Sequence, residues 1–162
     1  MALPDTRLTR TTQAPSFEDT KMAKAKKKSK KKRYSGPKSS MLKKSKASGS
    51  KGNPIAVRSQ VEFERYLDEG KPVIVDFWAE WCGPCKAFAP TFEKVGKEME
   101  GKAYFLKVDT EKATELANAF RIRSIPTVIA MVGDEVVDTS LGMMSEPALR
   151  KMTQRAIDLS LI

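Results

Sequence analysis

The chain has no histidine, and only two of its 162 residues are cysteines. Without histidine, Cys–His and Ser–His nucleophilic pairs and haem ligation by imidazole are excluded. Structural zinc is normally held by four Cys, His or carboxylate ligands, and two cysteines supply half of such a set. A zinc site would need a second chain, so we expect no metal and no other cofactor.

Long apolar runs are also lacking. No stretch approaches the roughly 18 apolar residues of a membrane-spanning helix. Arg7 and Arg10 are not followed by the apolar region of a secretory signal peptide. We therefore expect an intracellular protein without a transmembrane segment.

Positive charge is concentrated near the start of the chain. Residues 1–53 hold 16 of the 30 Lys and Arg residues but only three of the 20 Asp and Glu residues. Residues 21–52 contain few larger apolar side chains, too few to offset the chain entropy lost on folding. They are Met22, Tyr34, Met41 and Leu42. The prediction is a basic, disordered extension over residues 1–53 and one folded domain over residues 54–162.

Apolar patterning in the second part predicts an α/β domain. Residues 73–78 are apolar at nearly every position, which is typical of a parallel strand covered on both faces. Gly133-Asp134 indicates a hairpin turn, and Ser59 and Ser145 are helix-capping residues. The order of elements predicts a central mixed β-sheet with helices on both faces. Strands are expected at 55–57, 73–78, 103–108, 126–132 and 135–141, and helices at 59–70, 85–99, 111–120 and 145–157.

The two cysteines, Cys82 and Cys85, enclose Gly83-Pro84 where the 73–78 strand gives way to a helix. Unpaired N–H groups and the positive dipole end of a helix N-terminus favour a thiolate. We expect Cys82 to face outward and gain most from this, with Cys85 one turn later on the same side. Closing so small a loop removes little unfolded-chain entropy, so the pair is interpreted as reactive, not structural.

This arrangement predicts thiol–disulfide exchange. The Cys82 thiolate attacks a substrate disulfide and forms a mixed disulfide. Cys85 then attacks Cys82, which releases the reduced substrate and leaves an internal disulfide.

Two further residues bear on this chemistry. Asp76 lies inside an apolar strand, where burial would raise its pKa and suit it to relay a proton to or from Cys85. The alternative is a side chain at the strand's end that faces solvent. Pro126, after Ile125, opens a strand either as an ordinary trans proline, which local sequence favours, or through a cis bond beside the cysteines.

Residues 55–162 resemble thioredoxins. The resemblance rests on the segments Asp76–Lys86 and Ile125-Pro126-Thr127 and on Gly142. The resemblance implies the thioredoxin fold and protein-disulfide reductase activity, with Cys82 attacking, Cys85 resolving and Asp76 relaying protons. It also implies a cis Pro126, protein disulfides as clients and an upstream thiol or flavoprotein reductase; we expect a monomeric domain. The implied substrate-binding residues are Trp81, Gly83, Pro84, Ile125, Pro126, Gly142 and Met143.

One departure concerns a lysine. Thioredoxins usually keep a buried Lys near the active-site Asp, and the matching positions are Ala89 and Phe105. Without that cation, we expect Asp76 to stay protonated to higher pH, which would slow resolution at neutral pH.

A second hypothesis is a redox-switched holdase on the same fold. It would bind clients through an apolar rim and the basic extension, with the cysteines as a switch. The rim residues are Trp81, Ile125, Met143 and Met144. A disulfide oxidase or isomerase is disfavoured by Gly83-Pro84, which resembles the reducing members of the family.

The basic extension, densest at residues 24–33, allows several interpretations. It could bind nucleic acid or an anionic membrane, serve as a nuclear import signal or mitochondrial leader, or only keep the domain soluble. Arg7 and Arg10 fit a mitochondrial leader, and Asp5, Glu18 and Asp19 argue against it. We favour the mitochondrion over the nucleus.

Overall fold

Strands and helices alternate along the folded part in the order that the sequence predicts. The computed structural model describes residues 32–34, 36 and 52–162. The strands are β1 (Ile55–Val57), β2 (Val73–Trp78), β3 (Tyr104–Asp109), β4 (Thr127–Val132) and β5 (Glu135–Leu141). The helices are α1 (Gln60–Asp68), α2 (Gly83–Glu98), α3 (Thr114–Ala119) and α4 (Glu146–Ser160). In this part of the chain no helix is long and apolar enough to cross a membrane.

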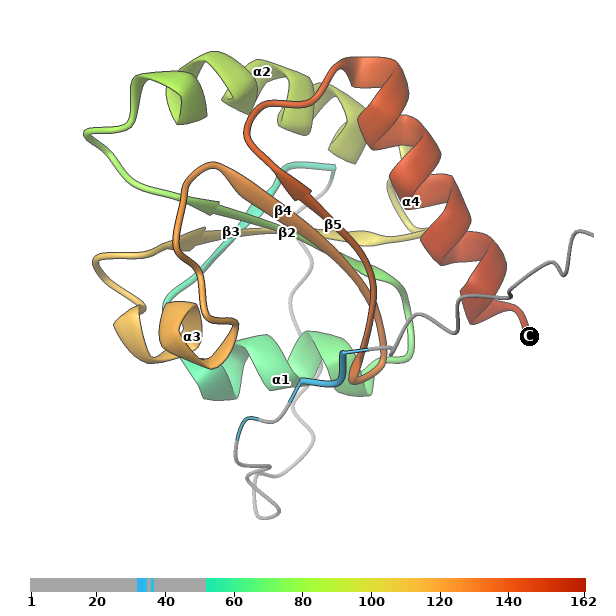
Figure 1. Cartoon of the computed structure of the whole chain (residues 1–162). Coiled ribbons are helices and arrows are strands. Elements are labelled where there is room, and N and C mark those ends of the chain that lie inside the picture. The colour runs from blue at the N-terminus through green and yellow to red at the C-terminus, as the bar shows by residue number, and fades with distance from the viewer. Residues whose placement is uncertain (1–31, 35, 37–51) are drawn as a thin grey trace, which may run out of the picture.

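The five strands form one mixed sheet in the order β1-β3-β2-β4-β5. β1 and β2 run parallel to β3, whereas β4 is antiparallel to β2 and β5 is antiparallel to β4. Helices α1 and α3 cover one face, and α2 and α4 cover the other (Figure 1). The predicted fold class, α/β with a central mixed sheet flanked by helices on both faces, is confirmed.

Strand β2 contributes to two cores because successive side chains of a strand point to opposite faces. Val73, Val75 and Phe77 pack in the core beneath α1 and α3. Ile74 packs in the core beneath α2 and α4. The alternation therefore turns Asp76 toward the face covered by α2 and α4, the face on which the disulfide-bearing helix lies.

Side-chain caps set where the helices begin. The Ser59 hydroxyl oxygen accepts a hydrogen bond from the Glu62 amide at 3.2 Å, and the Ser145 hydroxyl oxygen accepts one from the Ala148 amide at 3.4 Å. Both capping predictions are confirmed. The third helix begins later than residue 111, because turns at residues 110–112 precede α3.

A short piece of the basic segment, Lys32–Tyr34, lies beside the edge strand β5. Arg33 pairs with Glu135 in an antiparallel bridge. The Tyr34 amide donates to the Asp134 carbonyl at 3.0 Å, and the Val136 amide donates to the Lys32 carbonyl at 3.1 Å. This piece therefore covers one end of the exposed sheet edge.

Tyr34 anchors the same piece to the domain. Its side chain is only 7% exposed. The ring stacks on Phe120 with centroids 4.8 Å apart and meets Phe63 edge-on at 5.9 Å. No pattern in the sequence predicts this contact. The predicted disorder of residues 1–53 otherwise concerns residues 1–31, 35 and 37–51, which lie outside the described residues, so the division at residue 53 stays a prediction.

Candidate active site

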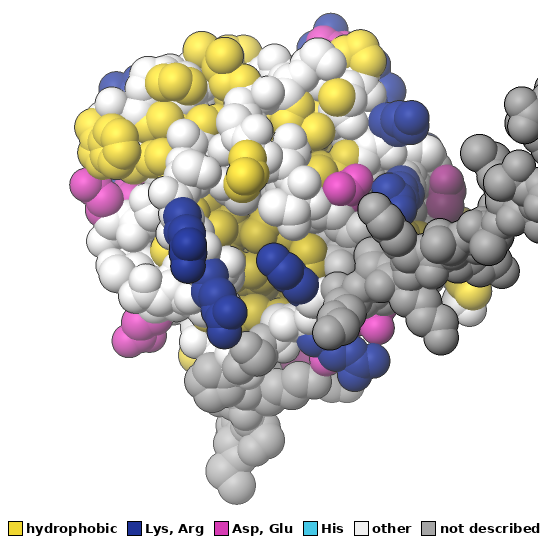
Figure 2. Space-filling model, viewed as in Figure 1, with side chains coloured by type: hydrophobic (Ala, Val, Ile, Leu, Met, Phe, Trp, Pro, Cys, Tyr) yellow, Lys and Arg dark blue, Asp and Glu magenta, His cyan; other side chains and the backbone are white. Residues whose placement is uncertain are grey.

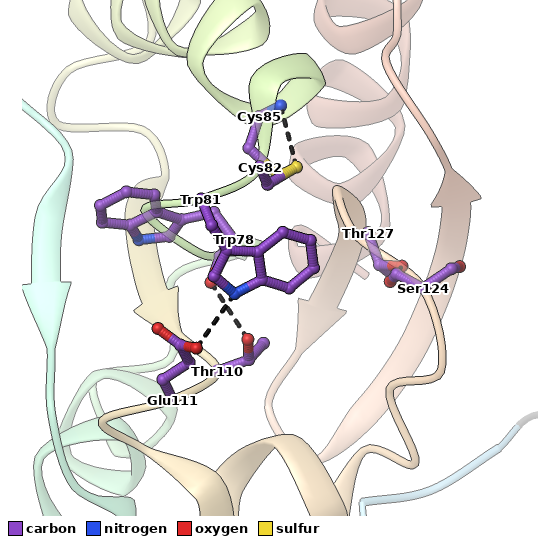
Figure 3. The surroundings of a disulfide bond; sticks show 8 residues. All are labelled: Trp78, Trp81, Cys82, Cys85, Thr110, Glu111, Ser124 and Thr127. Carbon is purple, nitrogen blue, oxygen red and sulfur yellow. Dashed lines mark hydrogen bonds between the residues drawn. A yellow bond between two sulfur atoms is a disulfide. The ribbon is translucent and has the colours of Figure 1, made fainter.

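Cys82 and Cys85 form a disulfide at the junction of β2 and α2, with their Cα atoms 5.3 Å apart (Figure 3). Cys82 is the N-cap residue of α2, and its Sγ accepts a hydrogen bond from the Cys85 amide at 3.2 Å. Pro84 occupies the first turn, where its missing N–H leaves no intrahelical bond unmade. The predicted strand-to-helix junction is confirmed.

The helix N-terminus favours negative charge on the Cys82 sulfur once the disulfide is reduced. The Cys85 amide is one of the unpaired N–H groups of the first turn, and it already points at this sulfur. The positive end of the helix dipole adds to the effect. Both cysteines are buried, so it is the N-cap position of Cys82 that distinguishes the two sulfurs.

The expectation that Cys82 faces outward is wrong. The residue is only 4% exposed, because its sulfur turns back toward the Cys85 amide and is bonded to the Cys85 sulfur. Its neighbour Trp81 is 70% exposed and Met143 is 58% exposed. The Cys82 sulfur is therefore recessed, whereas Trp81 and Met143 present apolar side chains to solvent.

Asp76 is completely buried, so the solvent-facing alternative is wrong. Neither of its carboxyl oxygens has a hydrogen-bond partner among the described residues. Burial raises the pKa of Asp76 from its ordinary 3.8 to about 7, and the positive charge of Lys107 acts in the opposite direction. The carboxyl can therefore exchange a proton near neutral pH.

The raised pKa of Asp76 agrees with the expectation that this carboxyl stays protonated to higher pH. The premise of that expectation, a missing lysine near Asp76, is wrong, because Lys107 lies there. It is the register partner of Asp76 across β2 and β3. Its Nζ lies 4.7 Å from the centroid of the Trp78 ring, a cation–π contact. The sequence pattern of β3 does indicate this position of Lys107. Side chains alternate along a strand, and Lys107, two residues after Phe105, therefore shares its face of the sheet.

The indole of Trp81 is oriented by Glu111. Its Nε1 donates a hydrogen bond to the Glu111 carboxylate at 3.0 Å (Figure 3). The turn that carries Glu111 is held to β2 through the Thr110 amide, which donates to the Trp78 carbonyl at 2.9 Å. Glu111 is not among the predicted site residues, because the contact spans 30 positions and no local pattern marks it.

The Ile125-Pro126 peptide bond is cis. The trans form favoured by local sequence is wrong, and the cis form implied by the resemblance is confirmed. The Gly142 amide donates to the Pro126 carbonyl at 2.8 Å, which holds the start of β4 beside the end of β5. Gly142 has φ 82°, in the left-handed region that favours glycine. Ser124 and Thr127, on either side of this peptide, lie in the surroundings of the disulfide (Figure 3).

The fold and this site together define a class: a small α/β thiol–disulfide oxidoreductase with a Cys-x-x-Cys disulfide at a helix N-terminus. Comparison with known proteins agrees. Residues 54–155 match the thioredoxin family. The chain is 40% identical over 101 residues to thioredoxin from Bacillus subtilis, which covers 62% of this chain and 96% of that relative. The chain belongs to the thioredoxin family.

Structural comparison places the chain on the thioredoxin fold. The similarity to Plasmodium falciparum thioredoxin has a TM-score of 0.58 at 39% identity and covers 62% of this chain and 97% of that one. Mitochondrial thioredoxin from Bos taurus is 39% identical over 94 residues, which are 58% of this chain and 57% of the relative. The chain spans 47% of a chloroplastic thioredoxin, M4, from Arabidopsis thaliana, at 38% identity over 91 residues.

The family is one of protein-disulfide oxidoreductases, and thiol–disulfide exchange is the activity that this chain shares with it. The Cys82–Cys85 disulfide is the group that such exchange requires. Membership implies protein disulfides as substrates and a reductase as partner.

Proposed function

We propose that this protein reduces protein disulfides, with Cys82 as the attacking thiolate and Cys85 as the resolving thiol. The observation that carries the proposal is the Cys82 sulfur at the N-cap of α2, with the Cys85 amide directed at it. In the dithiol form, this amide and the helix dipole favour the thiolate of Cys82 over that of Cys85. The disulfide is the only redox group that the proposal needs, and no cofactor takes part.

The reaction has two exchanges. In the first, the Cys82 thiolate attacks one sulfur of the client disulfide, a Cys82–client bond forms, and the other client sulfur leaves as a thiolate and is protonated. In the second, Cys85 loses its proton and attacks the Cys82 sulfur. The Cys82–Cys85 bond forms, and the second client sulfur leaves and is protonated. The client gains two electrons, which an upstream thiol or flavoprotein reductase returns to the cysteine pair.

Asp76 acts in the second exchange as the base that receives the Cys85 proton. A pKa near 7 lets the carboxyl exist in both protonation states at neutral pH, as a general base requires. It also lies on the side of β2 that α2 covers. Lys107 stabilises the carboxylate that the transfer needs.

The client chain lies across the rim around the disulfide. Trp81 and Met143 supply exposed apolar surface, and the cis peptide and the glycine that bonds to it supply backbone. The proposed substrate-binding set is Trp81, Gly83, Pro84, Ile125, Pro126, Gly142 and Met143.

Insulin reduction driven by dithiothreitol tests the proposal. We expect Cys82→Ser to abolish the protein-dependent rate. Cys85→Ser should accumulate a mixed disulfide that is visible on a non-reducing gel and absent in the double variant. Full activity in Cys82→Ser would show that this sulfur is not the nucleophile.

The exposed rim also supports a second candidate, the redox-switched holdase. Leu141, which is 72% exposed, adds to the exposed large apolar side chains Trp81 and Met143. Light scattering by an aggregating client, with the oxidised and the reduced protein, tests this role. Equal aggregation of the client with and without the protein, in both redox states, would rule out the holdase role.

For cellular location we propose the mitochondrion, with the nucleus as the alternative. The basic residues Arg7 and Arg10 and the similarity to a mitochondrial thioredoxin of Bos taurus support this. Imaging the chain with a C-terminal tag, together with sequencing of its mature N-terminus, distinguishes the two.

We further propose that the domain is monomeric and that residues 24–33 bind nucleic acid or anionic lipid with salt-dependent affinity. Sedimentation with DNA and with vesicles tests the binding.

A further inference from the structure

A groove with a volume of about 720 Å³ runs between β5 and the segment that follows α3. One wall is Lys32–Tyr34, the other is residues 119–124, and side chains of β4 and β5 form the floor. Figure 2 shows an apolar hollow on this face with Lys and Arg side chains beside it. We call it the Tyr34 groove, because Tyr34 is one of the residues that line it.

The other end of the groove adjoins the disulfide site. Ser124 and Thr127 line the groove and also lie in the surroundings of the disulfide (Figure 3). Leu141, another lining residue, immediately precedes Gly142, whose amide bonds to Pro126. A client chain bound at the disulfide can therefore continue along β5 into the groove.

The rim of the groove is positively charged. Lys32, Arg33, Arg121 and Arg123 line it, and none of the other described residues that line it is an Asp or a Glu. Arg33 pairs with Glu135 at 3.4 Å. Within the part of the chain that the structure describes, the other three cations form no ion pair. All four side chains are exposed, and the charges of Lys32, Arg121 and Arg123 are available to a ligand.

The floor of the groove combines three apolar side chains with two threonines, Thr127 and Thr139. Ile129 is buried at its base, Val136 is half-buried, and Leu141 stands 72% exposed at the end near the disulfide. An occupant that matches both parts needs apolar side chains for the floor and carboxylates for the rim. The rest of the basic extension carries the same sign of charge as the rim and is a poor match.

We propose that the Tyr34 groove binds an acidic, apolar segment of the client protein, adjacent to the disulfide that is reduced. The inference rests on the proposed function and adds the substrate class: clients whose cystine is flanked by Asp or Glu alternating with apolar residues. It also gives the N-terminal segment a role, since Lys32–Tyr34 forms one wall of the groove.

Fluorescence anisotropy with the oxidised full chain tests the binding. Three short labelled peptides without cysteine serve as probes: alternating Leu and Asp, alternating Leu and Lys, and alternating Ser and Asp. At low salt we expect the Leu–Asp peptide to bind about tenfold more tightly than the Leu–Lys peptide, and severalfold more tightly than the Ser–Asp peptide. Added salt should weaken this preference.

Charge reversal locates the site. The Arg121→Glu/Arg123→Glu variant should bind the Leu–Asp peptide about tenfold more weakly. The control variant Lys102→Glu/Lys151→Glu makes the same change in net charge at exposed positions outside the groove, and it should bind within about twofold of wild type. Unchanged affinity in the groove variant, or equal binding of the Leu–Asp and Ser–Asp peptides, would overturn the proposal, because attraction to the basic extension would then account for the binding.

Disulfide-containing versions of these peptides, with an uncharged one added, separate the two proposals. If all of the peptides are reduced at equal kcat/KM, the reductase proposal is supported and the proposed preference of the groove is wrong. If none of the peptides is reduced while binding still depends on Arg121 and Arg123, the reductase proposal is wrong and the groove proposal stands. We expect the acidic substrate to show the higher kcat/KM, and the advantage to be lost in the groove variant.

Discussion

Asp76 and Lys107 are register partners on the neighbouring strands β2 and β3, beneath the disulfide-bearing helix. The carboxyl is completely buried, and the ammonium group is held over the Trp78 ring with Nζ 4.7 Å from its centroid. Burial and the cation act in opposite directions on the pKa of Asp76, and burial is the larger effect. This balance leaves a carboxyl with a pKa of about 7 on the face of the sheet that the disulfide-bearing helix α2 covers.

The first prediction concerns the pH dependence of resolution. The rate at which Cys85 displaces the client should rise with pH through about 7 in wild type, because the Asp76 carboxylate becomes available as a base. In Asp76→Asn the rate should fall about tenfold or more at neutral pH and should lose this rise. Stopped-flow decay of a preformed mixed disulfide measures it. Identical profiles in the two proteins would exclude the proton relay.

The second prediction concerns stability. In the native state the pKa of Asp76 is raised to about 7, so between pH 4 and pH 7 the native state binds a proton that the unfolded state has lost. The stabilisation from a neutral Asp76 is therefore complete below pH 4 and is lost as pH rises to about 7. Relative to Asp76→Asn, the free energy of unfolding of wild type should fall by about 4 kcal/mol across this range. Urea unfolding of both oxidised proteins at several pH values measures the difference.

The third prediction concerns Lys107. Lys107→Met removes the charge that lowers the pKa of Asp76, so that pKa should rise further and the midpoint of the resolution profile should move to higher pH. Lys102→Met, at an exposed position, is the matched control and should leave the midpoint unchanged. The same midpoint in both variants would show that Lys107 does not act on Asp76.

The fourth prediction concerns Tyr34. Tyr34→Ala removes a buried ring that stacks on Phe120, and it should lower the free energy of unfolding by about 2 to 4 kcal/mol. Tyr34→Phe keeps the ring and loses a hydroxyl that has no hydrogen-bond partner among the described residues, so its cost should be below about 1 kcal/mol. Urea unfolding measures both. Equal stability of wild type and Tyr34→Ala would mean that residues 32–34 do not pack on the domain in solution.

Much of the fold could be predicted because the signals are local. The apolar run of β2, the capping serines Ser59 and Ser145 and the Gly133-Asp134 turn each specify their element within a few residues. The same local patterns predicted that the Cys82–Cys85 pair lies at a strand-to-helix junction. That position in turn predicted thiol–disulfide exchange.

Contacts between distant residues could not be predicted in this way. The Trp81–Glu111 hydrogen bond and the packing of Tyr34 on Phe120 join parts of the chain that no local pattern relates. The cis form of Ile125-Pro126 also ran against the local preference and followed only from the family resemblance.

By itself, then, the sequence determined which residues carry the redox chemistry and the order of strands and helices, because helix dipoles, caps and apolar periodicity act over short stretches of chain. Only the tertiary structure decided how deeply Cys82 is recessed, which cation lies beside Asp76 and where Tyr34 docks. Each of these depends on burial and on the pairing of strands remote in sequence, and both come into being only when the sheet and its two helical layers assemble.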